Sequence, residues 1–299
     1  MQKITIREIT RYLESLSPLS TQESYDNCGL LVGDFNTEVH GVLISLDCTE
    51  DILDEAIEKK CQLIISHHPI IFKGLKKLNG SDYVQRTIIK AVKNNIAIYA
   101  IHTNLDNYRF GVNYEISQRL KLKKTRILLP KENSLSKLVV YIPTEFAEKV
   151  SNSLFEAGAG RIGNYSDCHF STKGIGTYKP NEDSNPFEGK HGIRSQVEEI
   201  KAEFLVENSR ISDVQSAMFS SHPYEEVAYD IISLTNRNDY DGAGMIGEFE
   251  NAISEEDFLD LVKNNFNCGV IKHTNKLHKP IRNVAVCGGA GSFLINHAI

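Results

Sequence analysis

The stretch that decides the fold is Gln62-Leu63-Ile64-Ile65-Ser66-His67-His68-Pro69. Its apolar part, 62–66, has the length of a strand and shows no alternation of polar residues. Such a run is typical of a strand that is buried on both faces of a parallel sheet. Two histidines follow at its carboxyl end, where Pro69 favours a departure from strand geometry. We therefore predict a buried strand that delivers His67 and His68 to one edge of a sheet.

A second strand with the same character is predicted over 96–101, after a helix over 83–94. It ends in His102-Thr103-Asn104-Leu105-Asp106. Strands that alternate with helices at this spacing indicate an α/β domain with mainly parallel pairing. Because sites in open α/β sheets form at the carboxyl ends of the strands, we expect the two polar clusters to lie together.

The residue types in these clusters point to a divalent metal ion. Imidazole is the commonest metal ligand at neutral pH, and a histidine-carboxylate set with open positions suits zinc, iron or manganese. Asn104 is a candidate for orienting a ligand from behind. The alternatives without a metal ion are a hydrogen-bonded histidine pair at a strand end, and a loop in which Asp106 and Asn107 cap the backbone. The two clusters together favour the metal site.

The remaining chain divides into three parts. The first, 1–130, adds a helix that begins near Ile6 and stops before Pro18, a strand over 41–47, and a helix over 51–60 capped by Thr49. The second, 137–235, has strands over 137–142, 169–178, 197–206 and 227–234 and helices over 144–157 and 212–219, with Thr144 as an N-cap. This β-α-β-β-α-β order is that of an inserted ferredoxin-like domain. The third, 240–299, has a loop over 239–244, a helix over 255–264 and strands over 269–273 and 283–287.

Composition excludes several classes of protein. The chain has 299 residues and a formal net charge of −6, which does not support a broad basic face for nucleic acid. No apolar run reaches the roughly 18 residues of a membrane span, and the charged start lacks the apolar core of a signal peptide. The six cysteines are scattered singly, which favours buried free thiols. We expect a cytoplasmic protein.

Two further motifs carry less weight. Gly288-Gly289-Ala290-Gly291-Ser292 lies between a strand and a helix, as in phosphate-cradling loops, but it lacks the lysine of a P-loop. A tight structural turn is at least as good an interpretation, although the loop could approach the metal site. His222-Pro223-Tyr224-Glu225-Glu226 could bind a cation, but Pro223 argues against a helix there and favours a surface turn.

Four spaced motifs carry a family resemblance: Tyr25-Asp26-Asn27-x-Gly29-Leu30, Ile64-Ile65-Ser66-His67-His68-Pro69, His102-Thr103-Asn104-x-Asp106 and Cys287-Gly288-Gly289-Ala290-Gly291-Ser292. The sequence resembles the dinuclear metal-centre proteins known as GTP cyclohydrolase I type 2, or the Ngg-interacting-factor-three-like family. The stretches 158–165 and 222–230 are similar to the PII- or CutA-like insert of longer family members.

The resemblance implies two α/β lobes around a centre of two divalent metal ions, and a toroidal homohexamer. It implies that His67, His68 and Asp106 are metal ligands, that Asp106 bridges the ions, and that His102 is a polar residue beside them. The family pattern continues past the glycine loop with a His-x-x-x-Glu pair that completes the site. This pair is missing here, so we expect the third part of the chain to be truncated.

Three functions follow from these expectations. The leading hypothesis is a metal-dependent hydrolase in which a metal-activated water attacks a nucleotide or another phosphate-bearing small molecule, with His102 as proton shuttle. The second is a non-catalytic regulatory protein whose insert senses a small ligand. The third is an interaction scaffold or metal-handling protein that stores the ions.

Overall fold

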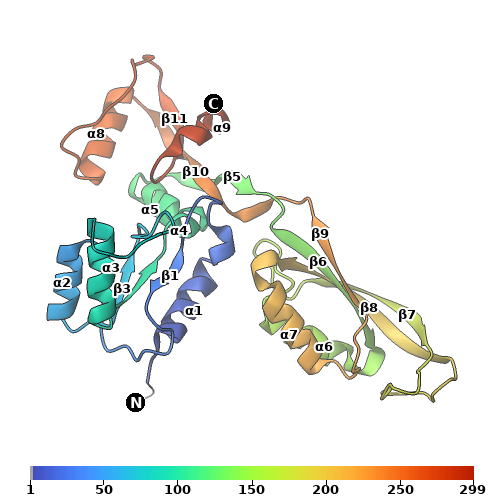
Figure 1. Cartoon of the computed structure of the whole chain (residues 1–299). Coiled ribbons are helices and arrows are strands. Elements are labelled where there is room, and N and C mark those ends of the chain that lie inside the picture. The colour runs from blue at the N-terminus through green and yellow to red at the C-terminus, as the bar shows by residue number, and fades with distance from the viewer. Residues whose placement is uncertain (1–2) are drawn as a thin grey trace. The chain divides into compact units, whose positions relative to one another are not determined.

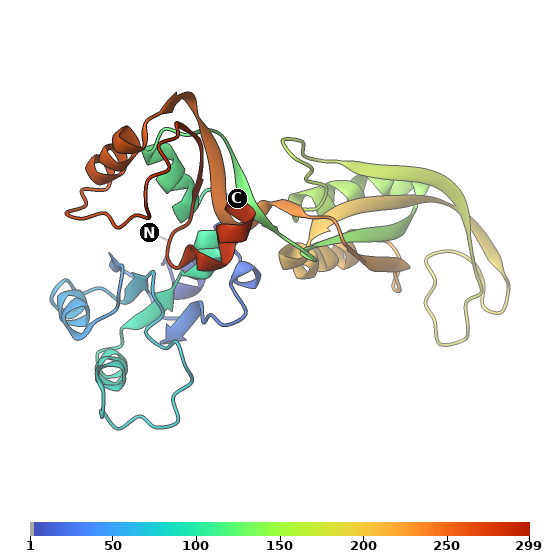
Figure 2. The same cartoon turned by 90° about the horizontal axis from the view of Figure 1, so that it is seen from above.

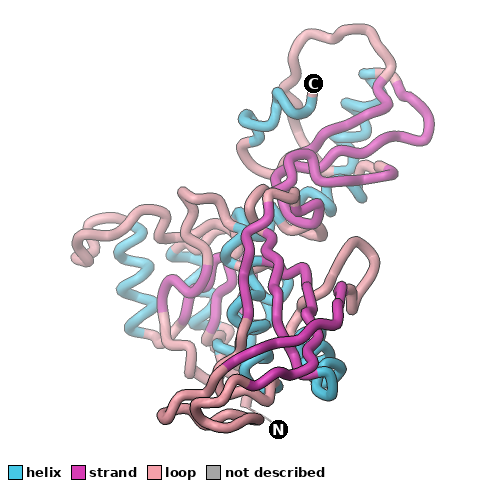
Figure 3. Tube along the Cα trace, turned by 90° about the vertical axis from the view of Figure 1, so that its right-hand side faces the viewer, coloured by secondary structure: helices cyan, strands magenta, loops and turns pink. Residues whose placement is uncertain are grey.

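The computed structural model describes residues 3–299, and the chain forms two compact units in it. Unit 1 comprises the chain up to Pro130 together with Asp239–Ile299, and unit 2 comprises Lys131–Asn238. The first and third parts of the sequence therefore pack into one unit, and the second part forms a unit of its own. Helices and strands occur in both units (Figure 3).

The larger sheet of unit 1 is mainly parallel, as predicted. It contains β1 (Gly29–Val32), β2 (Val42–Ser45), β3 (Leu63–Ser66) and β4 (Ala97–Ala100), in the order β1-β4-β3-β2. The pairs β2–β3 and β3–β4 are parallel, whereas β1 joins the edge of β4 in the antiparallel direction. Every residue of β3 and β4 is buried. These two strands are neighbours at the centre of the sheet.

Helices cover both faces of this sheet (Figure 1), which is why its central strands carry no polar alternation. On one face, α2 (Glu50–Glu58) and α3 (Tyr83–Lys93) pack through Leu53 and Ile88 against Ile64. On the other face, α1 (Ile6–Leu16) packs through Ile6 against Leu63 and its neighbours. Thr49 caps α2 as predicted, because its side chain accepts a hydrogen bond from Ile52 N.

The second sheet of unit 1 has the order β11-β10-β5. Its strands are β5 (Lys123–Lys131), β10 (Asn238–Ile253) and β11 (Ile281–Val286), and α8 (Glu255–Asn265) packs on it through Phe258 beside Phe249. Unit 1 also contains the helices α4 (Thr103–Asn107), α5 (Val112–Arg119) and α9 (Ile295–Ala298). Short 3-10 helices span Leu19–Thr21 and Gly291–Leu294.

Two predictions for the third part of the chain are wrong. The segment 239–244 was expected as a loop because of its glycines, but it lies within β10. A Cβ atom at Gly242 would lie 2.2 Å from Leu129 O, so the glycine permits close packing of β10 on β5. The strand expected over 269–273 does not form. Val270 is 81% exposed there, so its side chain gains no burial that would hold a strand in place.

Unit 2 has the predicted ferredoxin-like topology. Its elements are β6 (Leu135–Pro143), α6 (Ala147–Glu156), β7 (His169–Tyr178), β8 (Ser195–Glu207), α7 (Ile211–Ser221) and β9 (Tyr229–Leu234), with 3-10 helices over Thr144–Phe146 and Asn208–Arg210. The sheet order is β7-β8-β6-β9, and all its pairs are antiparallel. Helices α6 and α7 lie side by side against one face (Figure 1) and bury Leu154 and Met218 against Phe204.

The start of α6 differs from the prediction. Thr144 is not its N-cap, because a 3-10 helix precedes α6 and no side chain caps that turn. The Thr144 hydroxyl instead donates a hydrogen bond to Glu198 O at 3.2 Å. Between β7 and β8, the loop 179–194 extends from the end of the two strands (Figure 2). Among residues 3–299, no helix has the length and apolar character needed to cross a bilayer.

Candidate metal centre

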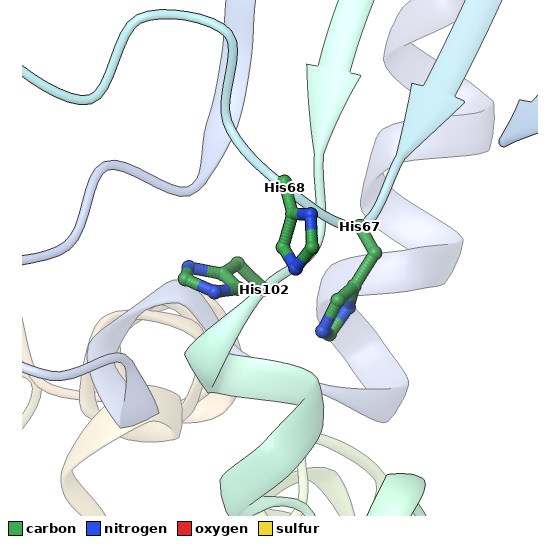
Figure 4. A group of neighbouring side chains, drawn as sticks. All are labelled: His67, His68 and His102. Carbon is green, nitrogen blue, oxygen red and sulfur yellow. The ribbon is translucent and has the colours of Figure 1, made fainter. Parts of the chain in front are cut away.

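Three histidines meet at the carboxyl edge of the larger sheet (Figure 4). His67 and His68 follow β3, and His102 follows β4, so parallel neighbours deliver all three to the same edge. One ring nitrogen from each histidine lies within 4.8 Å of the others. The ring centroids are 5.1 to 5.4 Å apart. The expected convergence of the two strand ends therefore occurs.

The chain turns at His67-His68, which allows two adjacent residues to face one space. His67 N donates to Ser45 O at 3.1 Å and His68 N donates to Leu46 O at 2.9 Å, which extends the contact with the end of β2. The Ser66 hydroxyl donates to His68 O at 2.9 Å and closes the turn. On a regular strand, the two side chains would have pointed to opposite faces.

Each histidine uses its Nδ1 atom for a hydrogen bond away from the centre. His67 Nδ1 donates to Ile101 O at 2.9 Å, and His68 Nδ1 donates to Asp47 Oδ1 at 2.7 Å. His102 Nδ1 donates to Asp26 Oδ1 at 2.9 Å. These bonds select the tautomer in which Nε2 carries the free lone pair. Metal-ligating histidines are held in this way by carbonyl and carboxylate groups behind them.

Asp26 holds the ring of His102 from behind, a role that was not predicted from the sequence. Its side chain is fully buried and also accepts hydrogen bonds from Thr103 N at 3.0 Å, from the Thr103 hydroxyl and from Cys28 Sγ at 3.1 Å. Burial alone would raise the pKa of Asp26. The hydrogen bonds from His102, Thr103 and Cys28 outweigh burial and hold the pKa below its usual range. Asp26 therefore stays ionised and fixes the imidazole of His102.

Asp47 was also missed, and it plays the same part behind His68. A signal for both aspartates exists in the sequence. Asp47 directly follows the strand predicted over 41–47, and Asp26 lies in the Tyr25-Asp26-Asn27 motif just before β1. Asn104 is fully buried and also lies behind the centre. Its Oδ1 accepts from His102 N and its Nδ2 donates to Ser17 O.

Asp106 brings a carboxylate to the centre from α4. Its Oδ1 lies 3.8 Å from His67 Nε2. This oxygen is buried and has no hydrogen-bond partner, so the aspartate does not cap the backbone through it. Burial raises the pKa of Asp106 to about 6, although the nearby His102 and His68 act in the opposite direction. A buried carboxylate oxygen without a partner costs free energy unless something else compensates its charge.

The donors present fit a divalent cation. His67, His68 and His102 each bring one ring nitrogen within 4.8 Å of the other two. Asp106 is not part of this cluster of three, but its buried, unpartnered Oδ1 lies 3.8 Å from His67 Nε2. Nitrogen and oxygen donors of this kind suit zinc, iron or manganese. Burial raises the pKa of Cys28 to about 11 and also raises that of Cys287, so both thiols are protonated in the absence of a metal ion.

The glycine loop approaches this centre through Asn113. Gly288 N donates to Asn113 Oδ1 at 2.7 Å, and Asn113 Nδ2 donates to Asp106 O at 2.9 Å. The charge of Asp106 reaches Cys287 next to this loop, where it adds to the effect of burial on the thiol pKa. The loop therefore lies beside the carboxylate.

Comparison with known proteins identifies the relatives of this arrangement. The family model for Duf34/NIF3 (NGG1p interacting factor 3) matches residues 4–299. The chain belongs to the Duf34/NIF3 family. It is 42% identical to the GTP cyclohydrolase 1 type 2 homolog of Halalkalibacterium halodurans, over 97% of this chain and 78% of that protein. It is 39% identical to the Bacillus subtilis protein of the same name, over 98% of this chain and 79% of that one.

A solved Duf34/NIF3 structure has the same fold. The Bacillus cereus protein related to NIF3 superposes with a TM-score of 0.86 at 39% identity, covering all of this chain and 80% of its own. A Staphylococcus aureus protein, SA1388, is similar with a TM-score of 0.72 at 32% identity, covering all of this chain and 79% of its own. The resemblance inferred from the four motifs is thus confirmed over nearly the whole chain.

Proposed function

We propose that this Duf34/NIF3 chain is a metal-dependent hydrolase that acts on a nucleotide or another phosphate-bearing small molecule. In this proposal His67, His68 and Asp106 would hold two divalent ions. The observation that carries it is the buried, unpartnered Oδ1 of Asp106 beside the free Nε2 of His67. A site built in this way is stabilised by a cation and is destabilised without one.

The chemistry divides between the ions and the chain. When bound, divalent ions lower the pKa of water and polarise a phosphoryl oxygen. Asp26 and Asp47 hold the rings of His102 and His68, so both Nε2 atoms keep a fixed direction. His102 can accept the proton of an attacking water at Nε2 and return it to the leaving group, while its Nδ1 proton stays on the hydrogen bond to Asp26.

His102 has an alternative role, because the structure groups its ring with His67 and His68 at ligand spacing. It would then hold an ion directly, and the proton would be carried by another group. The two roles differ in what the loss of the ring does to the metal content of the protein.

A non-catalytic, ligand-sensing role is the second candidate. The observation that favours it is a cavity whose lining residues all belong to unit 2. In that case the metal ions would stabilise or signal rather than react. The toroidal homohexamer and the cytoplasmic setting stay predictions of the sequence for either role.

Metal analysis and turnover test the proposal. The protein is stripped with a chelator, reloaded with zinc, manganese or iron(II), and its metal content is measured by inductively coupled plasma mass spectrometry. We expect His68→Ala to lose most of the bound metal, because the substitution removes the ring that Asp47 holds in place as a ligand. His40→Ala is the matched control, since the His40 side chain is 70% exposed and lies outside the centre.

The loaded protein is then incubated with a panel of nucleotides and phosphoesters, and products are separated chromatographically. Product from wild type and from His40→Ala, with little from His68→Ala, supports the hydrolase. Equal metal content in wild type and His68→Ala contradicts the metal site. Metal binding without product from any compound favours the ligand-sensing role instead.

A further inference from the structure

Unit 2 contains a cavity of about 690 Å³ that the proposed hydrolase does not use. It lies where the ends of β7 and β8 meet the loop 179–194 and the segment after α7. This volume is in the range of cavities that hold small organic molecules. The segment after α7 was predicted as a surface turn, but His222 is only 7% exposed and Tyr224 faces the cavity.

Aromatic rings form one side of this cavity. The ring of Tyr224 stands between those of Tyr178 and Phe187, with centroids 6.2 Å away in both cases. The rings are inclined by 62° and 48°, so they form a partial cage rather than a stack. His222 fixes Tyr224 in place, since its Nδ1 accepts from Tyr224 N and its Nε2 donates to Tyr141 O.

Acidic side chains also line the cavity, next to the rings. Glu199 is only 9% exposed, and its Oε1 accepts a hydrogen bond from the Tyr224 hydroxyl at 3.1 Å. Asp183, Glu225 and Glu226 also line the cavity, and Lys179 is the one basic residue among the lining residues. The cavity therefore carries an excess of negative charge, which disfavours phosphate and other anions.

Two features shape the cavity around Glu199. Position 176 is glycine, and a Cβ atom there would lie 2.0 Å from Glu199 Oε2, so the missing side chain leaves room for the carboxylate. Glu225 accepts a hydrogen bond from Asn185 N at 2.7 Å, and this bond ties the loop 179–194 to the segment after α7. Both features lie within unit 2, and they help to hold the carboxylates beside the aromatic rings of the cavity.

We propose that this cavity binds a small organic ammonium ion. Tyr178, Phe187 and Tyr224 line the cavity, and aromatic rings attract a cation through their quadrupoles. The carboxylate of Glu199 would compensate the charge of the cation. A bare metal ion fits less well. Within the described residues 3–299, the carboxylates of this cavity do not bring three oxygens as close together as a single ion requires.

The test uses the full chain and simple probes. Tetramethylammonium, choline and propylammonium are titrated by isothermal calorimetry, and 3,3-dimethyl-1-butanol serves as the uncharged isostere of choline. We expect saturable binding in the millimolar range or tighter for at least one ammonium probe. We expect the neutral isostere to bind at least about tenfold more weakly than choline if choline is the probe that binds. The absence of saturable binding of all three ammonium probes overturns the proposal, as does equal binding of choline and its isostere.

Two variants locate the binding. Glu199→Gln keeps the shape and a hydrogen-bond acceptor for Tyr224 but removes the charge, so the affinity should fall at least about tenfold. Glu198→Gln is the matched control, because Glu198 is the exposed neighbour on β8 and does not line the cavity. Phe187→Leu removes one ring from the loop, outside the core of unit 2, and covers the case in which Glu199→Gln fails to fold. Binding that is unchanged in Phe187→Leu and in a folded Glu199→Gln contradicts the proposed site.

Discussion

Asp106→Asn is expected to remove metal binding and, at the same time, to raise the stability of the metal-free protein. The buried Oδ1 of Asp106 has no hydrogen-bond partner, and burial raises the pKa of the carboxyl to about 6 from its ordinary 3.8. This shift corresponds to about 3 kcal/mol of cost for the ionised carboxylate in the fold at neutral pH. An asparagine carries no such charge. Thermal or urea unfolding at pH 7.5, with and without chelator, measures the effect.

The difference in stability between Asp106→Asn and wild type should depend on pH. Because the folded pKa of Asp106 lies above the unfolded one, the metal-free wild type loses stability through this group as pH rises from about 4 to above 6. The difference in unfolding free energy between Asp106→Asn and wild type should therefore be near zero at pH 4 and grow toward pH 7. Added zinc or manganese should reverse the order by stabilising only the wild type.

The control for Asp106→Asn is Asp260→Asn, the same chemical change at an exposed position of α8. It should change neither the metal content nor the unfolding curve beyond a few tenths of a kcal/mol. Two results together would show that the carboxylate is structural. In the first, Asp106→Asn still binds added metal. In the second, its metal-free form is less stable than metal-free wild type at pH 7.5.

His102→Gln is expected to lower kcat by about 100-fold or more while the protein keeps its metal. A positioned proton carrier contributes on the order of 10² to 10⁴ in rate, and glutamine cannot carry the proton. The glutamine amide can still donate a hydrogen bond to Asp26, so the local structure should persist. The measurement is kcat and KM for the substrate that the panel identifies, together with metal content of the same samples.

The outcome separates the two roles of His102. Retained metal with a lower kcat supports the proton carrier. Loss of metal together with activity assigns the ring to the ligand set that the structure groups with His67 and His68. His40→Gln serves as the control for the substitution itself, because the His40 side chain is exposed. Full activity in His102→Gln contradicts both roles.

Local signals were sufficient to predict the central sheet. The apolar run at 62–66 has the length of a strand and no polar alternation, which favours a strand covered on both faces, and β3 (Leu63–Ser66) is such a strand. Parallel neighbours then place the residues after β3 and β4 at one edge, so the meeting of His67 and His102 followed from topology. The antiparallel direction of the edge strand β1 could not be predicted, because the sequence of a short strand does not indicate in which direction it pairs.

The residues that support the histidines could not be predicted from local sequence patterns. Asp26 is 76 positions from His102 in the sequence, and no periodicity connects them. The same holds for the first part of β10, where glycines that indicate a loop instead allow two strands to approach closely. In both cases the deciding contact is tertiary, so it appears only when the partner segment is placed.

The close packing of β5 and β10 has a consequence for how this chain is assembled. Gly242 at the start of β10 lies against Leu129 and Pro130 near the end of β5, and the chain leaves unit 1 and returns to it at this point. Unit 2 thus occupies the place of a hairpin turn. Its excision, with an Asn-Gly turn joining the two strands, should leave a protein that still folds around the three histidines. The architecture therefore allows unit 2 to be gained or lost as a whole at a single joint.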